Sequence, residues 1–189
     1  VVKLLDAQNQ EKKRVMDMEN QLHQLMPLYR ERLLKDLVEG EFDQVCAPWL
    51  GLNLDMAAKY TCIVMRLTNK WHVCKNQNAT ERLALSLHVE QICAQLIADR
   101  PNSVSFKNRV SEFIIALKCK DSDYELDVLE ISNELRQRLQ QELGLECSIG
   151  VSEPALLQNF QDAYFEACEA IEQRYYLAED TGIAVKKYT

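Results

Sequence analysis

The sequence lacks the features that mark several common classes of protein. No apolar run reaches the ~18 residues that a membrane-spanning helix needs, and the opening VVKLLDAQNQEKKRV is too polar for a secretory signal. None of the seven cysteines belongs to a CxxC pair, and the three histidines share no ligand spacing with them. These absences argue against a membrane protein, a disulfide framework and a zinc site, and they favour reduced cysteines in a cytosolic protein.

An excess of basic residues is also missing. The chain has 22 lysines and arginines against 29 acidic residues, which gives a formal charge of −7 and a pI near 5.1. A surface that binds nucleic-acid phosphates needs clustered Lys and Arg, and the two local clusters, Lys12-Lys13-Arg14 and Lys186-Lys187, are short. A solvated helix face and a chain end explain them better, so we predict that this segment alone does not bind nucleic acid.

What the sequence does contain fits one folded domain with an extension. Of its 189 residues, 47% are apolar and 27% are charged, as is typical of a soluble globular chain. No internal repeat or low-complexity tract is present. Both ends resemble cuts through a longer protein, and we therefore expect further domains on either side.

Residues 1–39 contain no glycine and predict a long N-terminal helix. Steps of three and four residues, as in a coiled-coil seam, separate Val15, Met18, Leu22 and Leu25. The same stripe could belong to an amphipathic helix that packs on its own domain. We favour a two-stranded coiled coil before Pro27, and these four residues are its predicted homodimer contacts.

Pro27 removes a backbone donor and crowds the preceding turn, so we expect the helix to kink or restart there. A second helical stretch should then face a core through Leu33, Leu34, Leu37 and Val38. Gly40 is a natural helix stop, and we place a helical linker at 1–39 and the domain at 40–189. Just after this boundary, Trp49 and Leu50 are expected to anchor in the core.

The rest of the chain alternates between strand and helix patterns. The expected elements are a strand at 59–68, a helix at 80–100 with Thr80 as N-cap, a hairpin at 103–119, a helix at 123–143, a strand at 145–152, a helix at 154–176 and a strand at 182–188. This order predicts an α+β fold with a mixed sheet flanked by helices. In the hairpin SFKNRVSEFIIALKC, Asn108 should allow a left-handed turn, and Phe113, Ile115 and Leu117 should line one buried face.

Three local sequences resemble the nucleotide-cyclase-type GGDEF domains. Glu112-Phe113 before IIAL resembles the end of the hairpin signature, and CSIGVS at 147–152 resembles a family strand. The stretch YFEACEAIEQRYYLAEDTGIAVKKY resembles the closing helix and strand, with alanines at 163, 167 and 170. Ahead of the domain, LMPLYRERLLKDLVEG resembles the linker of YesN-type response regulators, whose middle domain is a degenerate GGDEF-like domain. The resemblance implies a ferredoxin-like core.

The resemblance also implies where catalytic groups would lie. Cyclases hold two divalent cations with carboxylates from the first strand and from the hairpin. Here the signature positions are Arg109, Val110, Ser111, Glu112 and Phe113. Two glycines are thus replaced, and a serine stands in place of a metal-binding carboxylate. The first strand ends in VMRLTNKW without any Asp, and Arg66 would bring positive charge toward the site.

Glu112 remains, but one carboxylate cannot hold the metal centre, and we expect it to cap the hairpin or to pair with a nearby base. The RxxD inhibitory motif of cyclases is also missing, because RPNS offers Arg100 and ends in Ser103. We therefore predict that the chain is not an enzyme and has no catalytic, metal-binding or cofactor-binding residues.

The resemblance implies a cytoplasmic regulatory and dimerisation domain of a bacterial AraC-family transcription regulator in a two-component system. In that family a receiver domain precedes the segment and a helix-turn-helix domain, which alone binds DNA, follows it, so the segment is expected to relay a signal from the first to the second. An alternative is a small-molecule or nucleotide sensor that uses the vestigial cyclase cleft. Residual cyclase activity is a third hypothesis, and it depends on metal binding beside Ser111.

Overall fold

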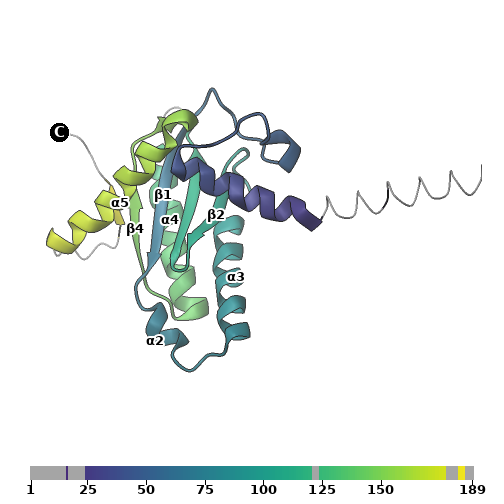
Figure 1. The fold of residues 1–189 in the computed structure, drawn as a ribbon. Coiled ribbons are helices and arrows are strands. Elements are labelled where there is room, and N and C mark those ends of the chain that lie inside the picture. The colour runs from purple at the N-terminus through teal and green to yellow at the C-terminus, as the bar shows by residue number, and fades with distance from the viewer. Residues whose placement is uncertain (1–15, 17–23, 121–123, 178–182, 186–189) are drawn as a thin grey trace, which may run out of the picture.

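The computed structural model describes residue 16 and residues 24–120, 124–177 and 183–185 (Figure 1). A six-stranded sheet forms its centre, in the order β2-β3-β1-β4-β6, with β5 paired to β1. The strands are β1 (Lys59–Leu67), β2 (Val104–Arg109), β3 (Glu112–Lys118), β4 (Cys147–Val151), β5 (Ala155–Leu156) and β6 (Ile183–Val185). Strands β4 and β6 run parallel, and the other described pairs run antiparallel. The predicted α+β fold with a mixed sheet is confirmed.

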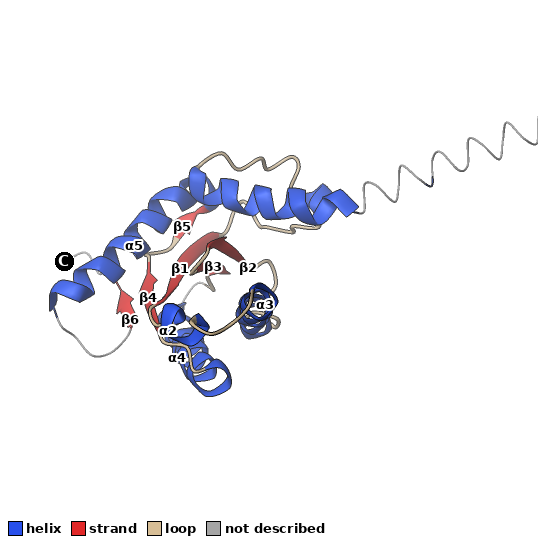
Figure 2. Ribbon diagram, turned by 60° about the horizontal axis from the view of Figure 1, so that its bottom comes forward, coloured by secondary structure: helices blue, strands red, loops and turns tan. Residues whose placement is uncertain are grey.

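Helices cover both faces of this sheet (Figure 2). The helices are one at residues 24–39, α2 (Lys70–Cys74), α3 (Ala79–Leu96), α4 (Tyr124–Leu143) and α5 (Phe160–Leu177). Helices α3 and α4 pack on one face, and the helix 24–39 and α5 pack on the other. None of these described helices combines the length and apolarity needed to cross a membrane.

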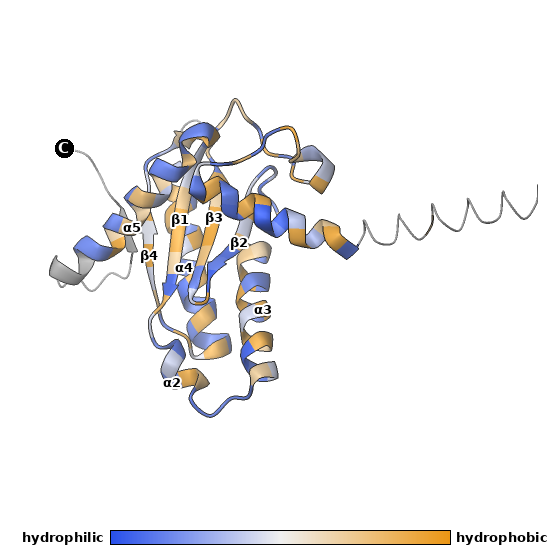
Figure 3. Ribbon diagram, in the orientation of Figure 1, coloured by the Kyte–Doolittle hydropathy of each residue, from blue (hydrophilic) through white to orange (hydrophobic). Residues whose placement is uncertain are grey.

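Strand β3 is buried on both faces, not on one as predicted. Its side chains alternate between two apolar clusters, because helices lie above and below it. Phe113 and Ile115 join the cluster under α3 and α4, whereas Ile114 and Ala116 join the cluster under α5. Figure 3 shows the resulting apolar character of β1 and β3. A strand covered on both faces has a continuous apolar run, as IIAL in this strand does.

Strand β4 and helix α5 approach one another unusually closely at Gly150. A Cβ atom on Gly150 would lie 1.9 Å from the carbonyl oxygen of Ala167 and 2.7 Å from Cγ1 of Ile171. Only glycine fits at this distance, since real Cβ atoms do not approach a carbonyl oxygen so closely. The close packing of helix on strand therefore explains the glycine of CSIGVS at the point where it meets Ala167.

The helix 24–39 packs on the domain through its second half. Leu33, Leu34, Leu37 and Val38 are buried in the cluster that α5 shares, as predicted. Gly40 ends the helix with a φ of 78°, and the Glu41 N–H donates to the Asp36 carbonyl at 2.9 Å, which closes a Schellman motif.

Within the described residues, the helix is unbroken from residue 24 to residue 39, so it does not restart at Pro27, and the alternative of a kink there stays a prediction. Of the predicted dimer contacts, Val15, Met18 and Leu22 lie outside the described residues, and Leu25 is 44% exposed.

The N-cap of α3 differs from the prediction. Asn78, not Thr80, caps the helix: its side chain accepts from the Glu81 N–H at 2.9 Å, and the Glu81 carboxylate accepts from the Asn78 N–H at 2.8 Å. This reciprocal pair is a capping box, which satisfies two backbone donors that Thr80 could not reach from inside the helix.

Two further local predictions are wrong. Trp49 is 81% exposed and does not anchor in the core, whereas Leu50, the other predicted anchor, packs against the core. Helix α5 begins at Phe160 and not near residue 154, because Ala155–Leu156 pair with β1 and Leu157–Asn159 form a 3-10 turn. At residues 155–156 the pairing with β1, not the local pattern, decides the conformation.

Candidate functional site at the hairpin turn

The β2–β3 turn lies beside the end of β1. The pairing of β1 with β3 sets Arg66 opposite Glu112, and the Leu67 N–H donates to the Ser111 carbonyl at 2.9 Å. A register shift interrupts the pairing of β2 with β3 between Lys107 and Arg109. The signature positions predicted from the sequence are thus brought together with the end of the first strand, where the cyclase site was expected.

Glu112 accepts hydrogen bonds on both carboxylate oxygens. Its Oε2 accepts from Arg66 Nε at 2.8 Å, and its Oε1 accepts from Asn108 Nδ2 at 2.7 Å and from the Tyr164 hydroxyl at 2.8 Å. Its side chain is only 5% exposed. The prediction that Glu112 pairs with a nearby base is confirmed, and the base is Arg66.

Asn108 has a different role from the one expected. Among the described residues, Asn102 is the one non-glycine residue with a positive φ, so Asn108 does not form a left-handed turn. Its side-chain amide instead donates to Glu112, and it lies 3.4 Å from the Tyr164 hydroxyl. Asn108 therefore helps to fix the orientation of the buried carboxylate.

The electrostatics of this group follow from its contacts. Burial acts to raise the pKa of Glu112, but hydrogen bonds from Arg66, Asn108 and Tyr164 outweigh it, so the pKa lies below its usual value. Burial, followed by the hydrogen bond to Glu112, raises the pKa of Tyr164 far above its ordinary value. Near neutral pH the carboxylate is charged and the tyrosine is a neutral donor.

Arg66 connects this carboxylate to helix α5. Its Nη2 donates to Cys168 Sγ at 3.1 Å, and its Nη1 lies 3.9 Å from Glu172. Burial would lower the pKa of Arg66, but the bond to Glu112 raises it overall. Burial also raises the pKa of the Cys168 thiol, which favours the neutral sulfur. The positive charge beside Glu112 is thus supplied by the protein itself.

Two lysines lie around the same turn. Lys70 donates to the Val110 carbonyl, and Lys107 donates to the Ser86 hydroxyl at 2.8 Å. Burial and then the nearby charge of Lys107 lower the pKa of Lys70. The turn is therefore bordered by cations, and Ser111 offers no negative charge to balance them.

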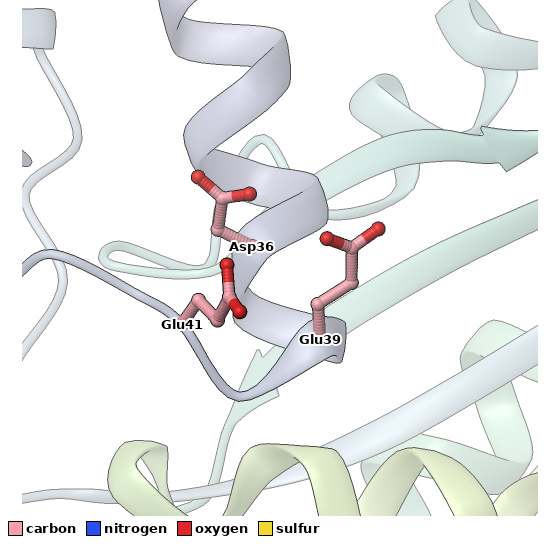
Figure 4. A group of neighbouring side chains, drawn as sticks. All are labelled: Asp36, Glu39 and Glu41. Atoms are coloured by element: carbon pink, nitrogen blue, oxygen red, sulfur yellow. The ribbon is translucent and has the colours of Figure 1, made fainter.

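Acidic side chains gather elsewhere in the molecule. In the part of the chain that the structure describes, three potential ligand atoms come within 4.8 Å of one another at Asp36, Glu39 and Glu41, at the end of the helix 24–39 (Figure 4). These groups are half-buried or exposed, and exposed acidic groups commonly cluster without an ion. The hairpin turn, as described, has no comparable set of ligands.

Arg100, the remaining arginine of the RxxD pattern, is engaged by its own domain. It donates to the Leu96 carbonyl at 3.1 Å and to Asp99 at 2.8 Å, and it lies 3.4 Å from Asp127 on α4. A cavity of about 240 Å³ between α3 and α4 is lined by Gln95, Leu96, Asp99, Arg100, Glu130, Ile131, Glu134 and Arg138. Acidic groups outnumber basic ones there, so the surroundings disfavour an anionic ligand.

Sequence reasoning missed three members of the network at Glu112. Tyr164 and Cys168 stand among the apolar residues of a helical pattern, which suggests packing, and Asn108 was expected only to allow a left-handed turn. A signal was present, because Tyr164 and Cys168 lie four residues apart and so share one face of their helix. Their partner could not be identified from the chain itself, since Glu112 is 52 positions from Tyr164.

Comparison with known proteins identifies the family. A family model described as a GGDEF-like domain matches residues 50–172. The chain belongs to the GGDEF-like domain family. A search of curated proteins found no match.

Solved structures agree on the fold of this GGDEF-like chain. The coiled coil and GGDEF domain of DgcB from Caulobacter crescentus, in complex with c-di-GMP, is 13% identical, with a TM-score of 0.62 over 97% of this chain and 99% of that one. The active GGEEF domain of a diguanylate cyclase from Vibrio cholerae is 14% identical, with a TM-score of 0.57 over 85% of this chain and 97% of that one. Diguanylate cyclase SiaD from Pseudomonas aeruginosa, in complex with its activator SiaC, is 12% identical, with a TM-score of 0.56 over 98% of this chain and 70% of that one. At these identities the likeness shows the fold alone.

Proposed function

We propose that this GGDEF-like chain is a non-catalytic regulatory and dimerisation domain. The observation that carries the proposal is the environment of Glu112: both of its oxygens accept hydrogen bonds from protein donors, and one of these donors is a guanidinium. A hard divalent cation needs several oxygen ligands that face it. Here the Glu112 carboxylate is bonded to Arg66, and Ser111 replaces the acidic residue of the signature. The guanidinium of Arg66 therefore balances the charge that a metal ion would balance in a cyclase.

The test is a direct assay for cyclase activity. We expect no cyclic dinucleotide from GTP with Mg²⁺ or Mn²⁺ at micromolar protein, because metal activation of the nucleophile is unavailable without ligands. The Arg66→Ala/Ser111→Asp variant is a useful companion, since it removes the guanidinium and restores a carboxylate. Product from the unaltered chain would overturn the proposal.

Dimerisation through the N-terminal helix is the second part of the proposal. The predicted contacts are Val15, Met18, Leu22 and Leu25. Leu25 is 44% exposed, which leaves apolar surface that could pack on a second copy. Equilibrium ultracentrifugation of the wild type and of a Met18→Glu/Leu22→Glu variant tests this contact, and equal masses for the two proteins would count against it.

The biological setting we propose is a bacterial AraC-family response regulator of the YesN type, in the cytoplasm. Residues 1–39 would be its linker from a receiver domain, and residues 40–189 the regulatory domain ahead of a helix-turn-helix domain. The support is the resemblance of LMPLYRERLLKDLVEG to such linkers and the acidic charge of the segment, which leaves DNA binding to another domain. The sequence that flanks this segment in the full-length protein tests the assignment, and the absence of both domains would refute it.

One observation favours a second candidate, a sensor of anionic small molecules at the same turn. After burial, the charge of Lys107 is the next cause that lowers the pKa of Lys70, and residue 111 is a serine that supplies no negative charge. Calorimetric titration with GTP and cyclic dinucleotides, with and without Mg²⁺, tests this candidate. We expect weak, salt-sensitive binding if it is right, and flat titrations at millimolar ligand would reject it.

A further inference from the structure

Helix α5 makes polar contacts with two separate parts of the molecule along one side. Gln161, Tyr164 and Cys168 follow one another at steps of three and four residues, which places them on one face of the helix. Gln161 donates to the Glu39 carbonyl, Tyr164 donates to Glu112, and Cys168 accepts from Arg66. One end of this stripe thus holds the N-terminal helix, and the other end holds the hairpin turn.

The contact at Glu39 fixes the end of the N-terminal helix in place. Gln161 Nε2 donates to the Glu39 carbonyl at 2.8 Å, and that carbonyl has no partner inside its own helix. The Gln161 amide also lies against Gly40, where an added Cβ would come within 2.8 Å of Gln161 Oε1. Figures 1 and 2 both show the end of the helix 24–39 beside the start of α5.

Apolar packing joins the same two elements. Leu34, Leu37 and Val38 share one buried cluster with Phe160 and Ala163 of α5. Side chains packed in a buried core cannot slide past one another freely. A shift of the C-terminal end of the helix 24–39 must therefore also displace α5. Helix α5 in turn cannot move along β4 without displacing the close contact at Gly150.

We propose that α5 couples the C-terminal end of the helix 24–39 to the β2–β3 turn, through the stripe Gln161, Tyr164 and Cys168. A displacement at Glu39 weakens the hydrogen bonds of the Glu112 carboxylate. Because coupling between two sites is reciprocal, loss of those bonds also weakens the contact of Gln161 with Glu39. This device deepens the regulatory role proposed above and rests on it for its biological use. The coupling itself is a property of the folded chain.

Hydrogen–deuterium exchange of the full 189-residue chain, without nucleotide, tests the coupling from both ends. Gln161→Ala perturbs the helix end, and the distant readout is exchange in residues 106–113. Glu112→Gln perturbs the turn, and the distant readout is exchange in residues 33–40. Loss of one hydrogen bond changes a local opening equilibrium by roughly fivefold, and we expect a rise of roughly twofold or more at the far end.

Two controls separate coupling from a general loss of stability. Helix α4 packs on the opposite face of the sheet, so its exchange should stay unchanged in both variants. Gln173→Ala, on an exposed position of α5, should alter neither distant readout. If Glu112→Gln does not fold, Tyr164→Phe perturbs the turn while leaving the Arg66–Glu112 pair intact.

The outcomes divide cleanly. Reciprocal rises at both far ends, with α4 unchanged, support the coupling. A rise confined to the mutated end, or an equal rise throughout the chain, overturns it. Detection of cyclase product would refute the proposed function without touching this result, whereas uncoupled exchange would refute the device and leave the absence of catalysis in place.

Discussion

Two parts of the same sheet, the β4–α5 contact and the β2–β3 turn, meet different physical requirements. At the contact, Gly150 lies so close to the Ala167 carbonyl that no side chain fits. At the turn, residues 109–112 have ordinary backbone conformations, so glycine is not needed there. The comparison teaches that packing restricts sequence wherever backbones touch. The turn, which has no residue with a positive φ at positions 109–112, accepts Arg109 and Val110 while the fold persists.

The strongest test of the contact is Gly150→Val. The new side chain must displace Ala167 or push α5 off the strand, and we expect a loss of at least about 3 kcal/mol in the free energy of unfolding, the upper range for overpacking. Urea denaturation followed by circular dichroism measures the loss. Gly144→Asn is the matched control, since Gly144 has a φ of 62° with open space around it, and asparagine tolerates that conformation. Similar losses from both substitutions would contradict this view of Gly150.

A smaller effect is expected from Arg66→Met at the turn. It leaves the buried Glu112 carboxylate without its cation, and since Arg66 is itself 31% exposed, we expect a loss of about 2 kcal/mol. The double variant Arg66→Met/Glu112→Leu removes both charges and should recover part of the stability, which a denaturation series can measure. If the double variant recovers no stability, side-chain packing rather than the charge pair accounts for the loss in Arg66→Met.

The pH dependence of the unfolding free energy should also report on the pair of Arg66 and Glu112. Because the pKa of Glu112 is lowered in the folded state, the unfolded chain binds this proton more readily. The contribution of Glu112 is therefore fully present above the ordinary carboxyl pKa of about 4.3, and it is lost as pH falls through the lower folded value. Unfolding curves from pH 7 to 3 should show the gap between wild type and Glu112→Gln closing on the acid side. A constant gap would contradict this assignment.

The smallest effect should come from rebuilding the signature without touching Glu112. Arg109→Gly/Val110→Gly/Ser111→Asp restores the residues of the cyclase turn, yet Glu112 stays bonded to Arg66, Asn108 and Tyr164. We expect a loss of roughly 1 to 2 kcal/mol, since each glycine adds chain entropy to the unfolded state, and still no product from GTP. Appearance of activity in this variant would show that the turn alone, not the Arg66 pair, prevents catalysis.

The sequence allowed the fold to be predicted because its patterns are local. Strand β1 and the second strand of the hairpin are apolar, β-rich runs, α4 has a helical apolar period, and the order of these elements predicts a mixed sheet. The capping box at Asn78 was missed in favour of Thr80, although its signal was present, since Glu81 follows Asn78 by three residues in NATE. The start of α5 was not visible in the sequence, because Pro154 suggested a helix start, whereas pairing of Ala155–Leu156 with β1 prevails.

The site was predicted less completely, for a physical reason. Departures from the signature could be seen directly at Ser111 and Arg109, and the pairing of Glu112 with a base was expected. Tyr164 and Cys168, by contrast, lie at apolar-face positions of α5, where a hydroxyl and a thiol suggest core packing. Their hydrogen bonds exist only because the sheet brings the turn beneath the helix, and no local pattern encodes that approach.

The guanidinium of Arg66 is attached to the chain and does not lose its proton under physiological conditions. A bound metal ion would leave the protein when a chelator was added or when its cellular supply fell. The charge balance at Glu112 is instead complete in every copy as soon as the chain has folded. Ionic composition and EDTA should therefore leave the shape of this region unaltered.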